Sequence, residues 1–182
     1  MKTSPQQHGA AAPAASAQPG KYLTFTLAQE SYGIPVLQVR EIIRLCPVTA
    51  VANMPAHVKG VINLRGKVIP LVDLRVRFRL PVGVDDERNC IVVTQITAAS
   101  GGSRLYGIVV DGVEEVATFT AQDIEPTPDF GGTLDSHFIT GMAMSGDGVK
   151  TLIDLDKIAA EDGTHSVRDA REANGSPPAV VS

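Results

Sequence analysis

The chain has 182 residues, of which 43% are hydrophobic, and a formal net charge of −4 at pH 7. This length suits one sizeable domain or two small ones, and a broad excess of basic residues, as a nucleic-acid binder would show, is lacking. Two isolated cysteines and no apolar run of ~20 residues argue against a zinc site, a disulfide framework and direct membrane insertion, which makes the cytoplasm the expected location.

The two ends of the chain differ in composition from its middle. Residues 1–20 are rich in Ala, Pro, Gln and Ser, and residues 161–182 have the same character. Such segments bury too little apolar surface to offset the entropy of ordering them. We therefore predict a flexible tail at each end and a folded region over residues 21–160.

The first elements of that region form a predicted hairpin. Residues 22–27 alternate as a strand, and Tyr32-Gly33-Ile34 begins a second strand after a turn at 29–31. In the following segment, apolar residues at 36, 39 and 43, with 37 and 42 beside them, predict one or two helical turns.

A second predicted hairpin spans residues 60–74. Val and Ile flank Gly66 on both sides, and a glycine permits the positive φ of a tight turn. Arg65 therefore lies at the tip. Pro70 cannot donate a ladder hydrogen bond, so we expect its part of the strand at an edge or a bulge. A third hairpin is predicted from strands at 90–97 and 105–110, around a Ser/Gly-rich turn.

The chain repeats itself. Tyr32-Gly33-Ile34 recurs as Tyr106-Gly107-Ile108 at an offset of 74, and Leu71-Val72-Asp73-Leu74 recurs as Leu152-Ile153-Asp154-Leu155 at an offset of 81. The matching order predicts a duplicated β unit, with an insertion in the loop at 130–133.

Asp73 and Asp154 hold equivalent places in the two repeats. Each ends an apolar strand before a segment with helical potential, so we expect both to be helix N-caps. A catalytic pair of carboxylates is the alternative. After Asp73, arginines at 75, 77 and 79 alternate with apolar residues as in a strand, but the helical spacing of the sister segment favours a short helix.

Charge is divided unevenly along the chain. Residues 21–80 contain nine Lys/Arg and three Asp/Glu, a net +6, whereas residues 81–160 contain four Lys/Arg and thirteen Asp/Glu, a net −9. Such polarity can orient protein partners. The alternative is two solvated faces without a function.

No sequence pattern supports catalysis. P-loop, GxGxxG, GxSxG and HExxH patterns do not occur. His57 and His137 lie beside loops without an evident nucleophile or set of metal ligands, so we expect surface histidines, no cofactor and no metal.

Four stretches, at residues 32–43, 58–66, 70–74 and 107–113, closely resemble the CheW family of bacterial chemotaxis coupling (adaptor) proteins. The resemblance covers essentially the folded region. It implies an all-β fold with a few short helices, made of two SH3-like five-stranded β-barrels related by internal duplication. The first barrel would span roughly 21–80 and the second roughly 88–160, with strand exchange at the seam left open.

The resemblance also implies a function without catalysis. An adaptor of this family would join the cytoplasmic tip of chemoreceptors to the regulatory domain of the histidine kinase CheA, and it could contact other CheW copies. It would associate with the inner membrane through the receptors and would bind no nucleic acid. The resemblance gives receptor or kinase contacts to Val39, Glu41, Gly60 and Arg65. It places Val61 and Leu64 in an apolar groove between the barrels.

Three alternatives stay open from the sequence. The first is a related adaptor of another chemosensory pathway, such as surface motility. The second is a small-ligand enzyme in the cleft between the barrels, dependent on His57 or Asp73. The third is an OB-like nucleic-acid module that binds through Arg75, Arg77 and Arg79. The resemblance gives no role to Cys46 or to the arginine run.

Overall fold

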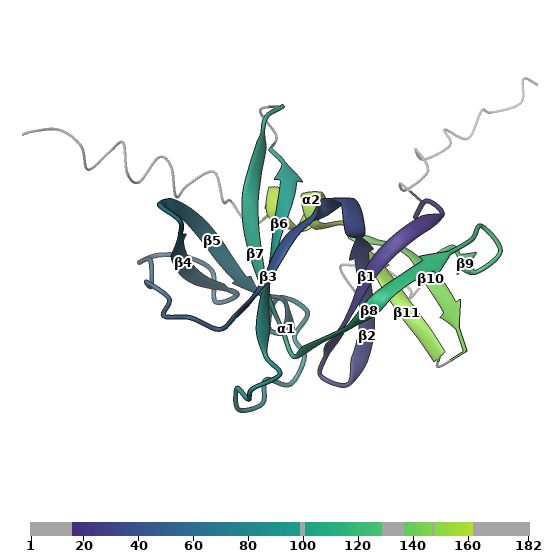
Figure 1. The fold of residues 1–182 in the computed structure, drawn as a ribbon, viewed down its shortest axis with the longest axis horizontal. Helices are drawn as coiled ribbons and strands as arrows, with labels where there is room; N and C mark the ends of the chain where they lie inside the picture. The colour runs from purple at the N-terminus through teal and green to yellow at the C-terminus, as the bar shows by residue number, and fades with distance from the viewer. Residues whose placement is uncertain (1–15, 99–100, 129–136, 147, 162–182) are drawn as a thin grey trace, which may run out of the picture.

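The computed structural model describes residues 16–98, 101–128, 137–146 and 148–161. Within these ranges the chain forms eleven strands, two short α-helices and one 3-10 turn (Figure 1). The two predicted tails and the loop at 130–133 lie largely outside the described residues. Among the described residues, no helix combines the length and hydrophobicity needed to cross a membrane.

The strands form two antiparallel-rich sheets that lie side by side (Figure 1). Sheet A has the strand order β8-β1-β2-β11-β10-β9. Its strands, in chain order, are β1 (Gly20–Leu27), β2 (Glu30–Pro35), β8 (Gly112–Phe119), β9 (Ile124–Glu125), β10 (Ile139–Ser145) and β11 (Gly148–Ile153).

Sheet B has the order β3-β6-β7-β5-β4. Its strands are β3 (Val39–Arg44), β4 (Val58–Leu64), β5 (Lys67–Asp73), β6 (Cys90–Thr97) and β7 (Ser103–Val110). The bridge between Thr49 and Val61 corresponds in sheet B to the two-residue β9 of sheet A. The predicted all-β fold with two duplicated units is confirmed.

The predicted hairpins are confirmed. Ala28 and Gln29 join β1 to β2 with φ of 48° and 72°, and Arg65 and Gly66 join β4 to β5 with φ of 50° and 80°. Two consecutive left-handed residues match the twist of a two-residue hairpin. Pro70 pairs with Val61 of β4 but precedes the parallel ladder between β5 and β7, so its missing N–H leaves that ladder intact.

The one or two helical turns expected over residues 36–43 are confirmed only for residues 36–38, and the rest of the segment is a strand. A single 3-10 turn, η1 (Val36–Gln38), leads directly into β3, which pairs antiparallel with β6. Partly buried and exposed residues alternate along β3. The hydrogen bonds of the β6 ladder therefore decide the conformation, and the helical spacing of the apolar residues does not.

The repeated Tyr-Gly-Ile motif has a packing reason. In the two parallel ladders Leu152 lies opposite Gly33, and Leu71 lies opposite Gly107. A Cβ on Gly33 would come within 2.9 Å of Leu152 Cδ2, and one on Gly107 within 3.0 Å of Leu71 Cδ1. Each glycine makes room for the leucine of the other repeat.

Each sheet combines strands from both halves of the chain. Sheet A takes β1 and β2 from the range 21–80 and β8 to β11 from the range 88–160. Sheet B takes β3, β4 and β5 from the first range and β6 and β7 from the second. The chain therefore crosses between the sheets at η1 and again between β7 and β8.

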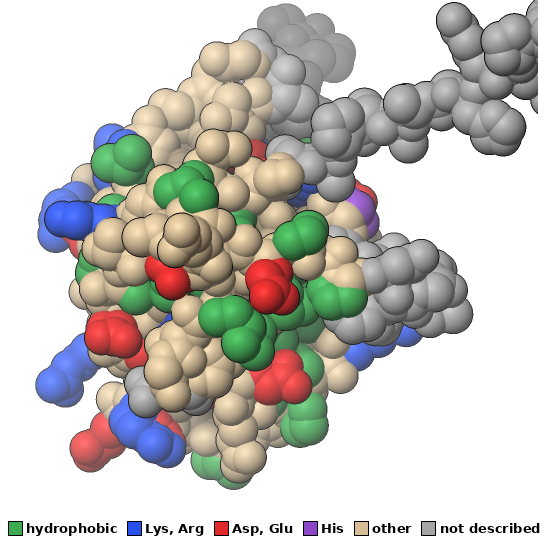
Figure 2. All heavy atoms as spheres, turned by 90° about the vertical axis from the view of Figure 1, so that its right-hand side faces the viewer, with side chains coloured by type: hydrophobic (Ala, Val, Ile, Leu, Met, Phe, Trp, Pro, Cys, Tyr) green, Lys and Arg blue, Asp and Glu red, His purple; other side chains and the backbone are tan. Residues whose placement is uncertain are grey.

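A large inter-sheet core fills the space between the two sheets. It contains side chains of both sheets together with residues of α1 (Leu74–Arg77) and α2 (Leu155–Glu161). Smaller clusters lie inside each sheet. On the side that carries β9, β10 and β11, acidic side chains lie among hydrophobic ones at the surface (Figure 2).

Candidate interaction site

The tip of the β4–β5 hairpin is joined to β3 by an ion pair. Arg65 Nη1 donates to Glu41 Oε2 over 2.7 Å, and the side chains are 77% and 24% exposed. Because β3 and β4 are the two edges of sheet B, the pair bridges these edges at one end of the sheet. Ion pairs this exposed contribute only about 0–1 kcal/mol to stability, so Arg65 can change its partner at little cost.

Two acceptors beside this pair lack a hydrogen bond. Glu41 Oε1 and Gln38 Oε1 are buried, and neither has a partner among the described residues. A buried acceptor without a donor costs about 1–3 kcal/mol.

Gly60 and Val61 lie where β4 meets the preceding segment. Thr49 and Val61 exchange two backbone hydrogen bonds of 2.9 Å each. Gly60 has a φ of 141°, and a Cβ at this position would lie 2.0 Å from Thr49 O. The structure therefore gives Gly60 a backbone role in holding this crossing.

The apolar groove expected between the barrels is filled by the inter-sheet core. Val39 packs against that core, whereas Leu64 packs against the separate cluster inside sheet B. Leu64 therefore lies inside sheet B, and Val61 is held through its backbone by Thr49. Of the six predicted residues, the structure brings Glu41 and Arg65 into direct contact.

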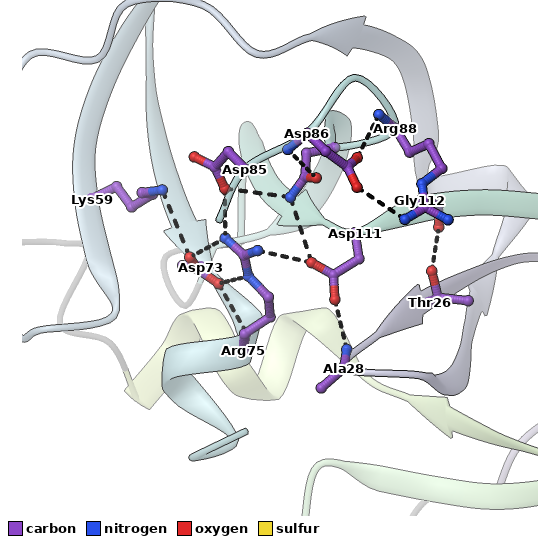
Figure 3. Close-up of polar contacts among 11 residues, drawn as sticks. Thr26, Ala28, Lys59, Asp73, Arg75, Asp85, Asp86, Arg88, Asp111 and Gly112 are labelled. Atoms are coloured by element: carbon purple, nitrogen blue, oxygen red, sulfur yellow. Dashed lines mark hydrogen bonds and ion pairs between the residues drawn. The ribbon is translucent and has the colours of Figure 1, made fainter. Parts of the chain in front are cut away.

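A polar network at the end of β5 opposite the Arg65 tip was not anticipated from the sequence (Figure 3). Arg75 is 1% exposed and binds Asp73 through two hydrogen bonds, Nε to Oδ1 at 3.0 Å and Nη2 to Oδ2 at 2.8 Å. Its Nη1 donates to Asp111 Oδ1 at 2.8 Å. Lys59 Nζ lies 3.7 Å from Asp73 Oδ2.

This network joins the two sheets. Asp111 follows β7 of sheet B, and its Oδ2 accepts a hydrogen bond of 2.6 Å from the backbone of Ala28 in the β1–β2 turn of sheet A. Burial alone would raise the pKa of Asp73, but hydrogen bonds from Arg75 and the charges of Arg75 and Lys59 outweigh it and lower that pKa. The hydrogen bond to Asp73 is the main reason that the pKa of Arg75 is raised. Both groups stay ionised, as a structural link requires.

The arginine run is therefore occupied within the protein. Arg75 is buried, and Arg77 Nη2 binds Glu161 Oε2 over 2.6 Å with its side chain 14% exposed. Two of the three arginines proposed for an OB-like module are thus committed to internal carboxylates, which leaves that alternative without its main contacts.

Both predicted N-caps are confirmed. Asp73 accepts from the backbone N–H of Arg75 at 3.0 Å, and Asp154 accepts from those of Asp156 and Lys157 at 2.9 and 3.3 Å. The capping role and the ion network account for Asp73 without catalysis. Among the described residues, no group of three His, Cys, Asp or Glu side chains is arranged to hold a metal.

Comparison with known proteins agrees with this architecture. The family model for the CheW-like domain matches residues 21–163 of the sequence. A chemotaxis protein CheW of Klebsiella aerogenes is 41% identical over 142 residues, which cover 78% of this chain and 82% of the relative. Protein FrzA of Myxococcus xanthus is 30% identical over 134 residues, covering 73% and 81%. The crystal structure of the scaffolding protein TtCheW from Thermoanaerobacter tengcongensis matches with a TM-score of 0.66 and 33% identity, covering 75% of this chain and 90% of that one.

Proposed function

We propose that this chain, which belongs to the CheW-like domain family, is a non-catalytic adaptor that couples the cytoplasmic tips of chemoreceptors to the histidine kinase CheA. The matched relatives include chemotaxis proteins, and the solved one is described as a scaffolding protein. The observation that carries the proposal is the exposed ion pair between Glu41 and Arg65, which lies at the tip of the β4–β5 hairpin.

The pair can act as an exchangeable contact. A carboxylate on a receptor helix could take the exposed Arg65 guanidinium through charge-assisted hydrogen bonds in place of Glu41. This change of partner would take place at the surface formed by β3 and β4. The binding energy would come from contacts at this end of sheet B, and no bond of a substrate would change.

The opposite net charges of sheet A and sheet B support assembly of this chain with barrels of other proteins or other copies. Residues 36–110, which supply sheet B, carry ten Lys/Arg and five Asp/Glu, a net +5. The described residues of 20–35 and 111–153, which supply sheet A, carry two Lys/Arg and six Asp/Glu, a net −4. Head-to-tail contacts with the kinase regulatory domain or with other copies would join opposite charges, and many linked weak contacts give strong avidity. The receptors would hold the assembly at the inner membrane.

A second candidate is an adaptor of another chemosensory pathway, such as surface motility. The match to protein FrzA supports this second candidate, because that relative is not named as a chemotaxis protein. The contacts proposed above would be the same, and only the cognate receptors and kinase would differ.

Substituting Arg65→Glu tests the proposed site. We expect the fold to persist, because the side chain is exposed, and the amount of CheA that sediments with receptor vesicles to fall at least ten-fold. Lys67→Glu is the matched control, since it makes the same charge change at the other side of the same exposed turn. Normal sedimentation with Arg65→Glu, or equal loss with Lys67→Glu, would overturn the assignment of Arg65.

A further inference from the structure

A polar hollow opens on sheet A, on elements that the proposed adaptor contacts at sheet B do not use. It has a volume of about 360 Å³ and is lined by Ser31, Glu114, Glu115, Gly148, Val149 and Lys150. These residues come from β2, β8 and the start of β11. Ligand pockets begin at about 300 Å³, so the hollow is large enough for one long side chain.

The floor of the hollow is an ion pair. Lys150 is 5% exposed, and its Nζ lies 2.9 Å from Glu114 Oε2. Ser31 Oγ donates to the other oxygen, Glu114 Oε1, over 2.8 Å. Burial by itself raises the pKa of Glu114, but these hydrogen bonds and the Lys150 charge outweigh it and lower the pKa. Glu114 therefore stays ionised and neutralises Lys150.

Sheet B provides an internal comparison for this floor. The positions of Ser31 and Lys150 correspond, by the offsets of 74 and 81, to Leu105 and Ile69 in sheet B. Ile69 belongs to the apolar cluster inside sheet B, and Leu105 packs against that cluster. The Lys150 and Glu114 side chains are 6% and 29% exposed, so this part of sheet A is polar and partly open to solvent where sheet B is apolar at the positions of Ser31 and Lys150.

The same comparison identifies an acceptor at the rim. Glu115 is the counterpart of Glu41: Glu115 pairs with β1 and Glu41 with β6, each just beyond a β-bulge. Glu41 binds the guanidinium of Arg65, but the counterpart of Arg65 in sheet A is Gly146. The carboxylate of Glu115 is exposed and forms no hydrogen bond or ion pair with another described residue.

We propose that this hollow binds an arginine side chain of a protein partner, which takes at Glu115 the place that Arg65 takes at Glu41. The two glutamates and Lys150 leave a net charge of −1, and a carboxylate can hold a guanidinium through two parallel hydrogen bonds. Val149, 49% exposed at the edge, offers an apolar surface to the methylene stem of the arginine. The surrounding surface of sheet A carries further acidic and hydrophobic side chains (Figure 2).

The proposal can be tested without receptor or kinase, so it stands or falls separately from the adaptor function. The full chain, labelled with ¹⁵N, is titrated with N-acetyl-arginine amide while amide chemical shifts are recorded. We expect saturable shifts confined to the residues that line the hollow. N-acetyl-citrulline amide, a neutral molecule of nearly the same shape, should bind at least ten-fold more weakly.

Two variants locate the contact. Glu115→Gln should weaken binding of the arginine probe at least five-fold, whereas Glu125→Gln, the same change at an exposed residue of β9, should leave it unchanged. Absence of shifts around the hollow would overturn the proposal. Equal binding of the citrulline probe, or unchanged binding by Glu115→Gln, would also overturn it.

Discussion

Arg65 and Arg75 both bind carboxylates, but the two ion pairs differ in burial. The Arg65 side chain is 77% exposed, whereas that of Arg75 is 1% exposed. Opening an exposed pair changes stability by about 0–1 kcal/mol, while removing one member of a buried pair costs about 3–5 kcal/mol. Burial therefore assigns Arg75 to the framework between the sheets and leaves Arg65 accessible for the contact proposed above.

Arg75→Met should destabilise the protein by about 3–5 kcal/mol, because it strands the buried Asp73 carboxylate without its main partner. Urea unfolding at pH 7 measures the difference. Arg88→Met is the control: Arg88 also binds an aspartate, but its side chain is 84% exposed, and we expect a change within about 0.5 kcal/mol. Equal effects of the two substitutions would contradict the structural role of Arg75.

The lowered pKa of Asp73 makes its contribution depend on pH. A carboxyl group whose pKa is lower in the folded state stabilises the fold above its ordinary value of about 4, and this stabilisation is lost as the pH falls through the folded-state pKa. Asp73→Asn keeps the N-cap oxygen and removes the charge. Its destabilisation should be full at pH 7 and should shrink steadily below about pH 4.

Unfolding of wild type and Asp73→Asn at a series of pH values checks this dependence. Asp86→Asn, at an exposed aspartate that also binds an arginine, should show a smaller difference from wild type throughout. A difference for Asp73→Asn that stays constant down to pH 3 would mean that the charge of Asp73 does not stabilise the fold.

At the scale of single elements, the sequence predicts what local chemistry determines. Gly66 predicts the hairpin turn, and the Asp residues before short helices predict both caps. It fails for β3, where Val39 and Ile43 have helical spacing but pair with Thr94 and Ile91 of a strand about fifty residues away. No local pattern encodes that partner.

Gly60→Ala tests the crossing at the start of β4. The added methyl group would lie 2.0 Å from Thr49 O, and the φ of 141° is unfavourable for any residue with a Cβ. Steric displacement and backbone strain together should cost at least about 2 kcal/mol, read from urea unfolding. Gly83→Ala, with open space around the added atom, is the control and should change stability by less than about 1 kcal/mol.

If Gly60→Ala is as stable as Gly83→Ala, the bridge between Thr49 and Val61 is not held in solution as described. If Gly60→Ala unfolds more easily and loses partner binding only to the extent that it loses folded protein, Gly60 affects partners through the backbone. A loss of binding without a loss of stability would indicate a direct contact at Gly60.

At the scale of the whole molecule, duplication could be read from the sequence, but the arrangement of the repeats could not. The repeated Tyr-Gly-Ile and Leu-x-Asp-Leu motifs identify two copies of one unit. They do not reveal that the hairpins β1–β2 and β6–β7 change places, so that β1–β2 joins β8 to β11 in sheet A and β6–β7 joins β3 to β5 in sheet B.

The candidate site was predictable only in part, for the same reason. Family resemblance identified Glu41 and Arg65, whereas the contacts of Arg75 with Asp111 depend on the exchange of strands. The hollow on sheet A carried one signal that was overlooked: Lys150 stands where the repeat has Ile69. Comparing the repeats position by position would have marked it as polar where its sister is apolar.

The most direct test of the central claim mixes receptor vesicles, CheA and this chain, and measures the fraction of kinase that sediments with the vesicles. The account predicts that kinase sediments only when the chain is present, that Lys67→Glu supports sedimentation and that Arg65→Glu does not. Kinase that sediments equally without the chain, or with Arg65→Glu in its place, would contradict an adaptor acting through the β4–β5 tip.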